Sequence, residues 1–284
     1  MYVKKLVPDW GMLLEIDISM NSIIFCIILL ILSYINRFYF WTRLTDAYRL
    51  EASAPKAFRA YFHSMLGRYV PGKVGLFLFR LRAYTGVSKR KLAAAMVTEY
   101  LAVLLSASLL ILSGTLFLPM QNPLLTRWLP GVIAVMILVF LYKPVFRYVV
   151  NLLLMITRKQ QLEVFPSSRA IAVATSGYLL SGLLNGLALF VILRGITELS
   201  VSLFPVVSGA YYLAGLIGML AFFAPGGIGV REGTMFLVLS ELVSPDSLVV
   251  AALLIRCLTI GVEMIMTVFS EIVYTVSKRR SNEK

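Results

Sequence analysis

Long apolar runs are the feature of this sequence that most limits what it can fold into. A helix of about 20 apolar residues crosses the hydrocarbon core of a bilayer. Runs of this length lie at residues 21–41, 91–118, 129–150, 169–194 and 246–276. Only 14% of the 284 residues are charged, whereas about a quarter of a soluble domain is charged. We therefore predict an all-α polytopic membrane protein, a single domain over residues 1–284 with five full spans.

Two further apolar segments, 56–86 and 201–242, are interrupted by proline and glycine. The first contains the break Pro71-Gly72-Lys73-Val74-Gly75 and the second the break Pro225-Gly226-Gly227-Ile228-Gly229. Proline lacks a backbone donor and clashes with the preceding turn, whereas glycine lets the chain reverse. Broken backbone is tolerated in a bilayer only where protein or water satisfies it. We therefore predict two re-entrant helix–break–helix hairpins, each entering and leaving the membrane on one side.

The basic residues fit this topology. The formal net charge is +13, and most of the 27 lysine and arginine residues lie between the apolar runs. If both interrupted segments are hairpins, these connections share one side of the membrane, and the other side receives Lys4, Lys5, Arg127 and Arg194. The positive-inside rule assigns the basic side to the cytoplasm. We expect a plasma-membrane protein with a cytoplasmic C-terminus and an extracytoplasmic N-terminus, and we expect no nucleic-acid binding.

The two interrupted segments also repeat each other. The pattern Pro-Gly-x-x-Gly recurs at 71–75 and 225–229, and each copy is followed by a helix, a short linker and a span. Residues 56–118 and 201–276 are therefore predicted to be two units of one domain. Because the hairpins enter from opposite sides, the repeat is inverted. Inverted repeats place a binding site near the membrane midplane and alternate the access to it.

Each break is predicted to leave the first amide groups of the following helix free, which makes an anion site. Guanidinium groups bind phosphate in a bidentate manner, so Arg68 and Arg231 are the expected primary contacts. The candidate substrate-binding residues are Arg68, Pro71, Gly72, Lys73, Gly75, Arg80, Pro225, Gly226, Gly227, Gly229, Arg231 and Glu232. The alternatives are that Arg231 and Glu232 pair with neighbours to hold the hairpin, and that Lys73 extends to the membrane surface.

Three more charged residues, Glu99, Arg256 and Glu263, lie inside the predicted spans. The repeat aligns Glu99 with Arg256, and we expect these two to form a salt bridge between the units, with substrate contact as the alternative. Glu263 either completes that network or relays a proton. Intramembrane charges are rare and are functional by default.

These motifs resemble the lysylphosphatidylglycerol synthase transmembrane region, a family of flippase-like membrane proteins. The resemblance covers nearly the whole chain from about residue 20. It rests on Gly67-Arg68-Tyr69-Val70-Pro71-Gly72-Lys73-Val74-Gly75, Thr98-Glu99-Tyr100, Ala224-Pro225-Gly226-Gly227-Ile228-Gly229-Val230-Arg231-Glu232-Gly233 and Arg256. It implies translocation of an anionic lipid, either a polyprenyl-phosphate-linked sugar or an (aminoacyl) phospholipid. The sequence has no counterpart of the soluble synthase domain, so we expect it not to make lysyl lipid and favour the polyprenyl-phosphate sugar.

The sequence gives no sign of a catalytic site. It contains no Ser/His/Asp set, metal-ligand cluster or Walker motif, so we expect no catalytic residue, metal or cofactor, and not an enzyme. Two other functions stay open. One is a polyprenyl-phosphate-dependent transferase, for which Asp46 and Glu51 are the candidate bases. The other is a membrane anchor of a glycosyltransferase or lipid-modifying enzyme.

The run 169–194 carries a series of small residues. Gly177, Ser181, Gly182, Asn185 and Gly186 suit either close helix packing within the chain or a homodimer.

Overall fold

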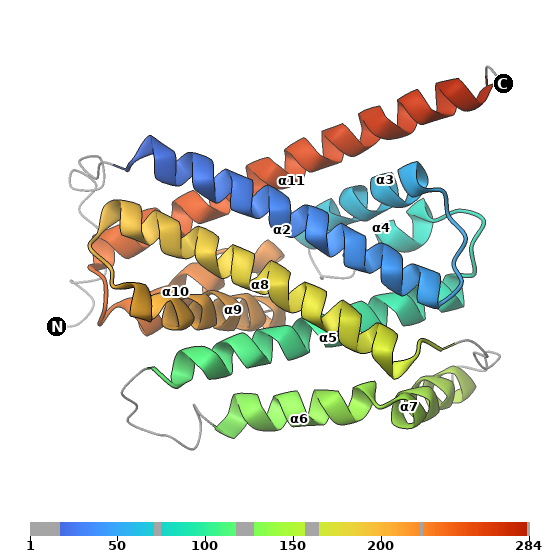
Figure 1. Ribbon diagram of the computed structural model, residues 1–284, viewed down its shortest axis with the longest axis horizontal. Coiled ribbons are helices and arrows are strands. Elements are labelled where there is room, and N and C mark those ends of the chain that lie inside the picture. Colours follow the sequence, from blue (N-terminus) through green and yellow to red (C-terminus); the bar gives the residue numbers. More distant parts are fainter. Residues whose placement is uncertain (1–17, 71–74, 118–127, 157–164, 222–223, 283–284) are drawn as a thin grey trace.

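The computed structural model of the chain is built of helices (Figure 1). It describes residues 18–70, 75–117, 128–156, 165–221 and 224–282, and no strand occurs in these ranges. The elements in chain order are α2 (Met20–Ala47), α3 (Ala54–Met65), η2 (Leu66–Tyr69), α4 (Gly75–Ala83), α5 (Lys89–Thr115), α6 (Leu129–Leu141), α7 (Lys143–Ile156), α8 (Ser168–Ile196), η4 (Val201–Leu203), α9 (Phe204–Leu220), η5 (Pro225–Gly227), α10 (Val230–Leu239) and α11 (Pro245–Asn282).

Within the described residues, five helical segments are long and apolar enough to cross a membrane. They are Met20–Ala47, Lys89–Thr115, Ser168–Ile196, Val201–Leu220 and Pro245–Arg280. The prediction of an all-α polytopic membrane protein is confirmed.

One predicted span is divided in the structure. The run 129–150 was expected to be a single helix, but the helix α6 ends at Leu141 and α7 begins at Lys143. Pro144 in the first turn of α7 has no amide to donate to the preceding turn, so the helix cannot continue through it. In length and composition, the segment Val201–Leu220 takes the place of this span among the five candidates.

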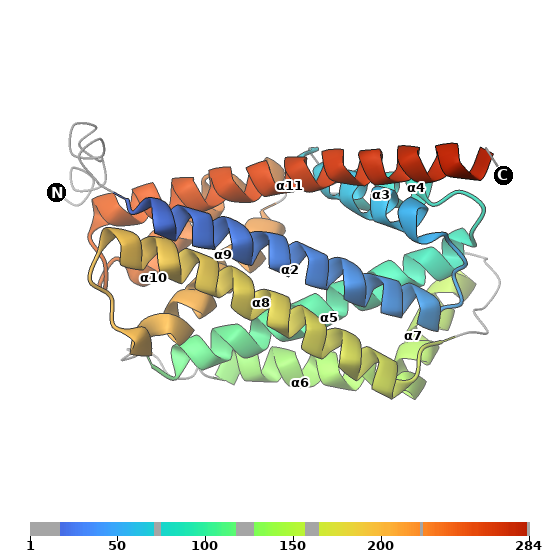
Figure 2. The same ribbon diagram turned by 45° about the horizontal axis from the view of Figure 1, so that its top comes forward.

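Helices α2 and α8 run side by side in opposite directions through the molecule (Figures 1 and 2). The Asn36 amide nitrogen on α2 donates to the Gly177 carbonyl and to the Ser181 hydroxyl on α8, each at 2.7 Å. Gly177 also lies against the ring of Phe40, and a side chain there would overlap it. Small residues in α8 thus allow the two backbones to approach closely.

The same stripe of α8 serves other helices of the chain. Gly182 lies against Leu110 of α5, and Gly186 lies against Ser208 of α9. These residues thus serve close helix packing within the chain, which is one of the two roles that the sequence left open.

Two helical hairpins lie at opposite ends of the molecule. α3 and α4 pack together where α2 ends and α5 begins, and α9 and α10 pack together where α8 ends and α11 begins (Figures 1 and 2). At the first turn, a Cβ atom on Gly67 would lie 2.5 Å from the carbonyl carbon of Gly75, so the two sides of the turn meet backbone to backbone. At the second, Gly226, Gly227 and Gly229 have φ angles of 59°, 73° and 80°, which favour glycine.

The helices follow the same order twice. α2 is followed by the hairpin α3–α4 and the long helix α5, and α8 is followed by the hairpin α9–α10 and the long helix α11. α5 and α11 run in opposite directions (Figure 1). The units predicted from the Pro-Gly motifs correspond to α3–α5 and α9–α11, and the structure adds α2 and α8 in front of them.

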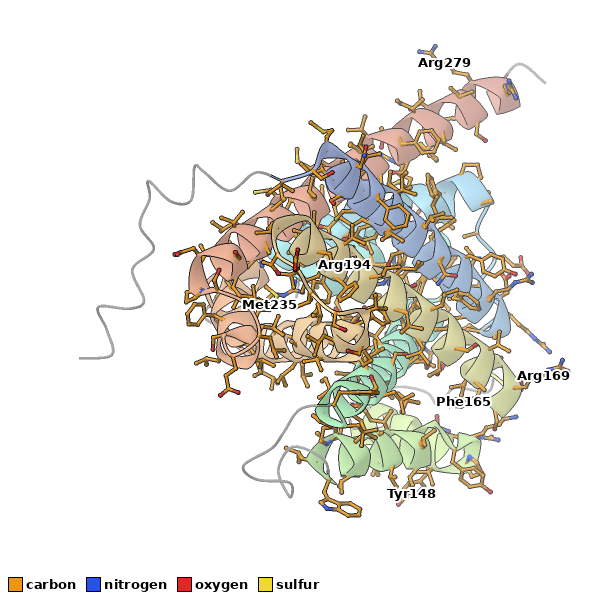
Figure 3. The ribbon with its side chains drawn as sticks, turned by 60° about the vertical axis from the view of Figure 1, so that its left-hand side comes forward. Tyr148, Phe165, Arg169, Arg194, Met235 and Arg279 are labelled. Carbon is orange, nitrogen blue, oxygen red and sulfur yellow. The ribbon has the colours of Figure 1, made fainter. Side chains whose placement is uncertain are left out.

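The two sides of the bundle at which the long helices end differ in the number of basic residues that they carry. Arg169 at the start of α8 and Arg279 near the end of α11 project away from the bundle, and Arg194 lies at the other end of α8 (Figure 3). α2 ends, α5 begins and α11 ends at the side that carries Arg169 and Arg279 (Figure 1). Apart from Arg194, the basic residues at the ends of α2, α5, α8 and α11 lie at that side (Figure 1).

The α5–α9 crossing provides a test of the packing. A Cβ atom on Gly114 would lie 2.8 Å from the Pro205 carbonyl oxygen and 3.1 Å from the Gly209 Cα atom. We expect Gly114→Ala to lower the free energy of unfolding by about 1–3 kcal/mol, because backbone must move. Thermal unfolding in detergent micelles measures the effect. Gly131→Ala on α6 is the control, since nothing lies within 4 Å of its Cβ position. Equal stability of the two variants would contradict the packing.

Candidate functional site

The turns of the two hairpins meet inside the molecule. The 3₁₀ segments η2 and η5 are in contact. A Cβ atom on Gly226 would lie 3.0 Å from Tyr69 Cδ1 and 3.0 Å from Arg256 Nη2. Gly226 also has a φ of 59°, so close approach and backbone conformation both call for glycine here. Residues far apart in the sequence thus build one site.

A small cavity lies at this meeting point. Its polar lining comes from both turns and from α9, α10 and α11, and its apolar lining comes from α10 and α11. The lining residues include Arg68, Tyr69, Tyr211, Gly226, Arg231, Glu232, Met235, Ile255 and Arg256. The volume of about 30 Å³ holds roughly one or two water molecules.

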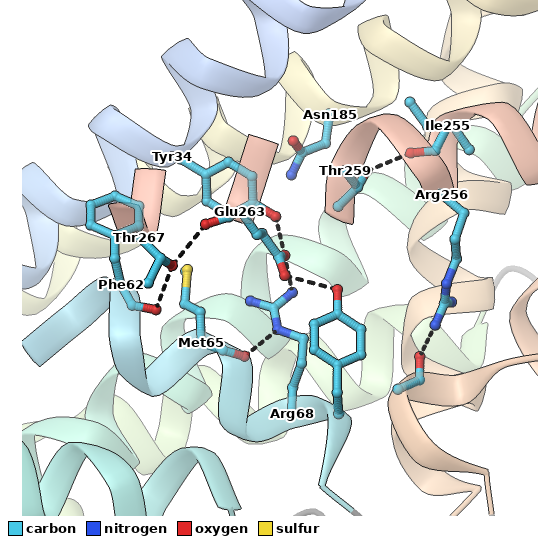
Figure 4. A network of polar contacts seen from close by, with 12 residues as sticks. Tyr34, Phe62, Met65, Arg68, Asn185, Ile255, Arg256, Thr259, Glu263 and Thr267 are labelled. Atoms are coloured by element: carbon cyan, nitrogen blue, oxygen red, sulfur yellow. Dashed lines mark hydrogen bonds and ion pairs between the residues drawn. The ribbon is translucent and has the colours of Figure 1, made fainter. Parts of the chain in front are cut away.

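At the first turn, Arg68 is held by a buried carboxylate (Figure 4). Arg68 Nη1 lies 2.8 Å from Glu263 Oε1, and the Glu263 side chain is fully buried. The hydroxyls of Tyr34 and Tyr69 donate to the same carboxylate, Tyr69 at 2.8 Å. One cation and two donors satisfy Glu263 and connect α2, η2 and α11.

At the second turn, Arg256 of α11 holds the broken backbone. Its Nη2 atom donates to the Gly226 carbonyl at 2.9 Å (Figure 4), and its Nη1 atom lies 3.2 Å from Glu232 Oε1. Glu232 Oε2 accepts from the Gly229 amide at 2.7 Å. The start of α10 is therefore capped by its own glutamate, and the prediction that this helix end is bare was wrong for the Gly229 amide.

Arg231 is the cation at the cavity that has no carboxylate partner among the described residues. Its stem lies against Gly218 and Gly227, and a side chain on Gly218 would overlap it. Its guanidinium lies 5.5 Å from the centre of the Tyr211 ring, where a cation–π interaction partly offsets its desolvation. The predicted primary contacts Arg68 and Arg231 thus line one cavity, and Arg231 is the one without a carboxylate partner among the described residues.

A comparison with known protein families shows which family the chain belongs to. The model of the family described as "Lysylphosphatidylglycerol synthase TM region" matches residues 7–266. The chain belongs to this family. The resemblance drawn from the motifs is confirmed, and the family is a membrane domain of flippase-like proteins. A comparison with curated proteins gives no significant match.

In this member of the lysylphosphatidylglycerol synthase TM region family, Arg80 does not reach the cavity. Its side chain is buried and forms an ion pair with Glu99. Its Nε atom donates to the Ser64 hydroxyl at 2.9 Å, and its guanidinium lies 4.5 Å from the Trp41 ring centre. Arg80, a predicted substrate contact, thus does not line the cavity, and its guanidinium is held by Glu99, Ser64 and Trp41 inside the protein.

The predicted salt bridge between Glu99 and Arg256 was also wrong. Glu99 pairs with Arg80 and Arg256 pairs with Glu232. Each pair joins the second helix of a hairpin to the long helix that follows it, α4 to α5 and α10 to α11. The signs are reversed, since the hairpin helix supplies the cation in the first unit and the anion in the second. Alignment of the two units correctly placed Glu99 and Arg256 at equivalent positions, but it did not predict that their partners are Arg80 and Glu232.

The remaining predicted residues support the turns. Gly75 lies against Gly67, and Gly227 lies against Arg231. Pro225 begins η5. Pro71, Gly72 and Lys73 lie outside the described residues.

Sequence reasoning missed two tyrosines of the site, Tyr34 and Tyr69. Tyr69 follows Arg68 directly inside the first motif and lines the cavity, as does Tyr211. Tyr34 of α2 binds Glu263. The signal for Tyr69 was its place in the motif, whereas nothing in the sequence connects Tyr34 with Glu263.

The structural role of Arg80 is testable by a double-mutant cycle. Arg80→Met leaves Glu99 buried without its cation, so we expect the free energy of unfolding to fall by about 3–5 kcal/mol. Arg80→Met combined with Glu99→Leu removes both charges, and we expect it to recover most of that loss. Arg82→Met, at an exposed position on the same helix, is the control with little effect. If Arg80→Met abolished lipid binding with no loss of stability, Arg80 would be a substrate contact after all.

Proposed function

We propose that the protein translocates an anionic lipid across the membrane and binds the lipid phosphate where the two hairpin turns meet. The single observation that carries this proposal is the cavity lined by Arg68, Arg231 and Arg256 inside a membrane helix bundle. Charged side chains are costly within a bilayer and mark substrate pathways. A site that is built only for stability would pair all of them, whereas Arg231 has no carboxylate partner among the residues described.

The chemistry of the site suits phosphate. Guanidinium groups bind phosphate oxygens in pairs, and the glycines at 226 and 227 bring backbone close to the cavity. Arg68 and Arg256 are held by Glu263 and Glu232, so an entering phosphate competes with these carboxylates. If phosphate replaces these carboxylates, its binding changes the contacts that hold both turns. A ligand shifts a protein between two conformations only when it interacts differently with each of them.

The topology supports alternating access. We propose that both hairpins are re-entrant, because α3–α4 and α9–α10 lie at opposite ends of the bundle and meet at their turns (Figures 1 and 2). The basic ends of the helices define the cytoplasmic side. Motion of one helix set relative to the other would open the site to one face at a time. The lipid tails would stay in the bilayer while the head group crosses.

A polyprenyl-phosphate-linked sugar is the lipid that we favour, with an (aminoacyl) phospholipid as the alternative. A lysylated head group is itself cationic, and the arginines of the cavity would repel it. On this account the protein is a transporter in the plasma membrane and does not catalyse a covalent reaction.

Arg231→Ala tests the proposal. We expect it to lower translocation of a labelled polyprenyl-phosphate sugar by at least about tenfold in proteoliposomes, because the unpaired cation of the cavity is lost. Arg231→Lys should restore only part of the rate, since lysine cannot bind in a bidentate manner. The matched control is Arg194→Ala, which removes an exposed arginine from the end of α8.

Wild-type rates in Arg231→Ala would rule out the phosphate site. If the variant also kept a co-purifying glycosyltransferase active, the role of an enzyme anchor would be favoured in its place.

A further inference from the structure

The two carboxylates that hold the turn arginines differ in how firmly they are fixed. Glu263 has a fully buried side chain, and it binds Arg68 and two tyrosine hydroxyls. The Glu232 side chain is 21% exposed, and it binds the Gly229 amide at 2.7 Å and Arg256 Nη1 at 3.2 Å. Glu232 lines the cavity, whereas Glu263 is not among the described residues that line it. Glu232 is therefore the carboxylate that a ligand in the cavity meets.

The contact between Glu232 and the Gly229 amide borders open space. Apart from its chain neighbours, no described atom lies within 4 Å of the position that a Cβ atom on Gly229 would take. The second turn also has a bond that does not involve this carboxylate, because Arg256 Nη2 donates to the Gly226 carbonyl at 2.9 Å. Displacement of Glu232 would free Arg256 Nη1 and the Gly229 amide, and the broken backbone would remain held.

The two donors that Glu232 occupies are of the kinds that bind phosphate. One is a guanidinium group, and the other is an amide at the start of a helix. They lie at the cavity that Arg231 also lines, and Arg231 has no carboxylate partner among the described residues. A carboxylate and a phosphodiester each carry one negative charge, so either one can satisfy these donors.

We propose that Glu232 is an internal substitute for the lipid phosphate. It binds Arg256 and the Gly229 amide until the phosphate displaces it, and it returns when the lipid leaves. This inference rests on the proposed function and assigns to that site the group that controls release. A tethered carboxylate competes at a high effective concentration, so it weakens lipid binding and shortens the time that the lipid stays bound. Such a limit serves transport, because slow release of the bound molecule sets the rate of many cycles.

The competing interpretation is that Glu232 only clamps α10 to α11. Glutamine at this position keeps the shape of the side chain and can still accept from the Gly229 amide, but it loses the charge that pairs with Arg256. If Glu232 is only a clamp, Glu232→Gln lowers stability and leaves lipid affinity unchanged or weaker. An internal competitor gives the opposite change in affinity. Lipid affinity therefore separates the two interpretations.

The experiment uses the full chain in lipid nanodiscs, titrated with farnesyl phosphate, with farnesol and inorganic phosphate as further probes. We expect Glu232→Gln to bind farnesyl phosphate at least about tenfold more tightly than the wild-type protein does, because the competing charge is gone. Farnesol binding should not change, since farnesol has no anionic group to exchange with the carboxylate. In proteoliposomes, Glu232→Gln should translocate a labelled polyprenyl-phosphate sugar at least about threefold more slowly, because release becomes limiting.

The matched control is Glu241→Gln. Glu241 is an exposed acidic residue just beyond the end of α10, so this variant removes the same charge from the same hairpin without touching the cavity. We expect its affinity for farnesyl phosphate and its translocation rate to equal those of the wild-type protein.

Three results would overturn the inference and leave the proposed function standing. They are unchanged or weaker farnesyl phosphate binding by Glu232→Gln, an equal gain in Glu241→Gln, and tighter binding without slower translocation. Inorganic phosphate that binds the wild-type protein as tightly as farnesyl phosphate does would show a free-anion site in place of a lipid site. That result, or failure of the wild-type protein to bind farnesyl phosphate, would overturn the inference and the proposed function together.

Discussion

A helix that breaks inside a membrane leaves backbone groups that lipid cannot satisfy, so protein must hold the break. Here one helix, α11, holds both turns. Arg256 bonds the Gly226 carbonyl of the second turn, and Glu263, about two helical turns further along, holds Arg68 of the first turn. The two partners lie on one face of α11, so the hairpins meet side by side (Figure 4). The position of every other site residue depends on this arrangement.

The ion pairs also explain why one arginine of the site has no carboxylate partner among the described residues. Arg80 with Glu99 and Glu232 with Arg256 join each hairpin to the long helix that follows it, with reversed signs. These bonds stabilise the two units but leave Arg231 without a carboxylate partner among the described residues. A cation that is kept unpaired in an apolar bundle serves a ligand better than it serves stability. The fold and the proposed phosphate site therefore arise from the same set of charges.

Hydropathy and local chain chemistry were enough to predict the helical membrane class, the two breaks and the place of Arg68 and Arg231 at their meeting point. These features depend on short stretches of sequence, because proline and glycine act on their own turn. The partners of Glu99 and Arg256 depend on helix rotation and hairpin depth, which no single segment encodes. The inward position of Tyr34, which binds Glu263, was hidden for a similar reason. α2 is apolar around most of its circumference, so its sequence does not show which face points inward.

The central claim is that each hairpin returns to the side from which it enters, and cysteine labelling in oriented vesicles tests it most directly. The positions are Ser53 and Ser88, which flank the first hairpin, and Ser200 and Ser244, which flank the second, all exposed. Each serine is replaced by cysteine in a chain whose Cys26 and Cys257 are alanine. A membrane-impermeant maleimide should label the first two positions only from the cytoplasmic side and the other two only from the outside. Labelling of either pair from opposite sides would make that hairpin a single crossing and contradict the account.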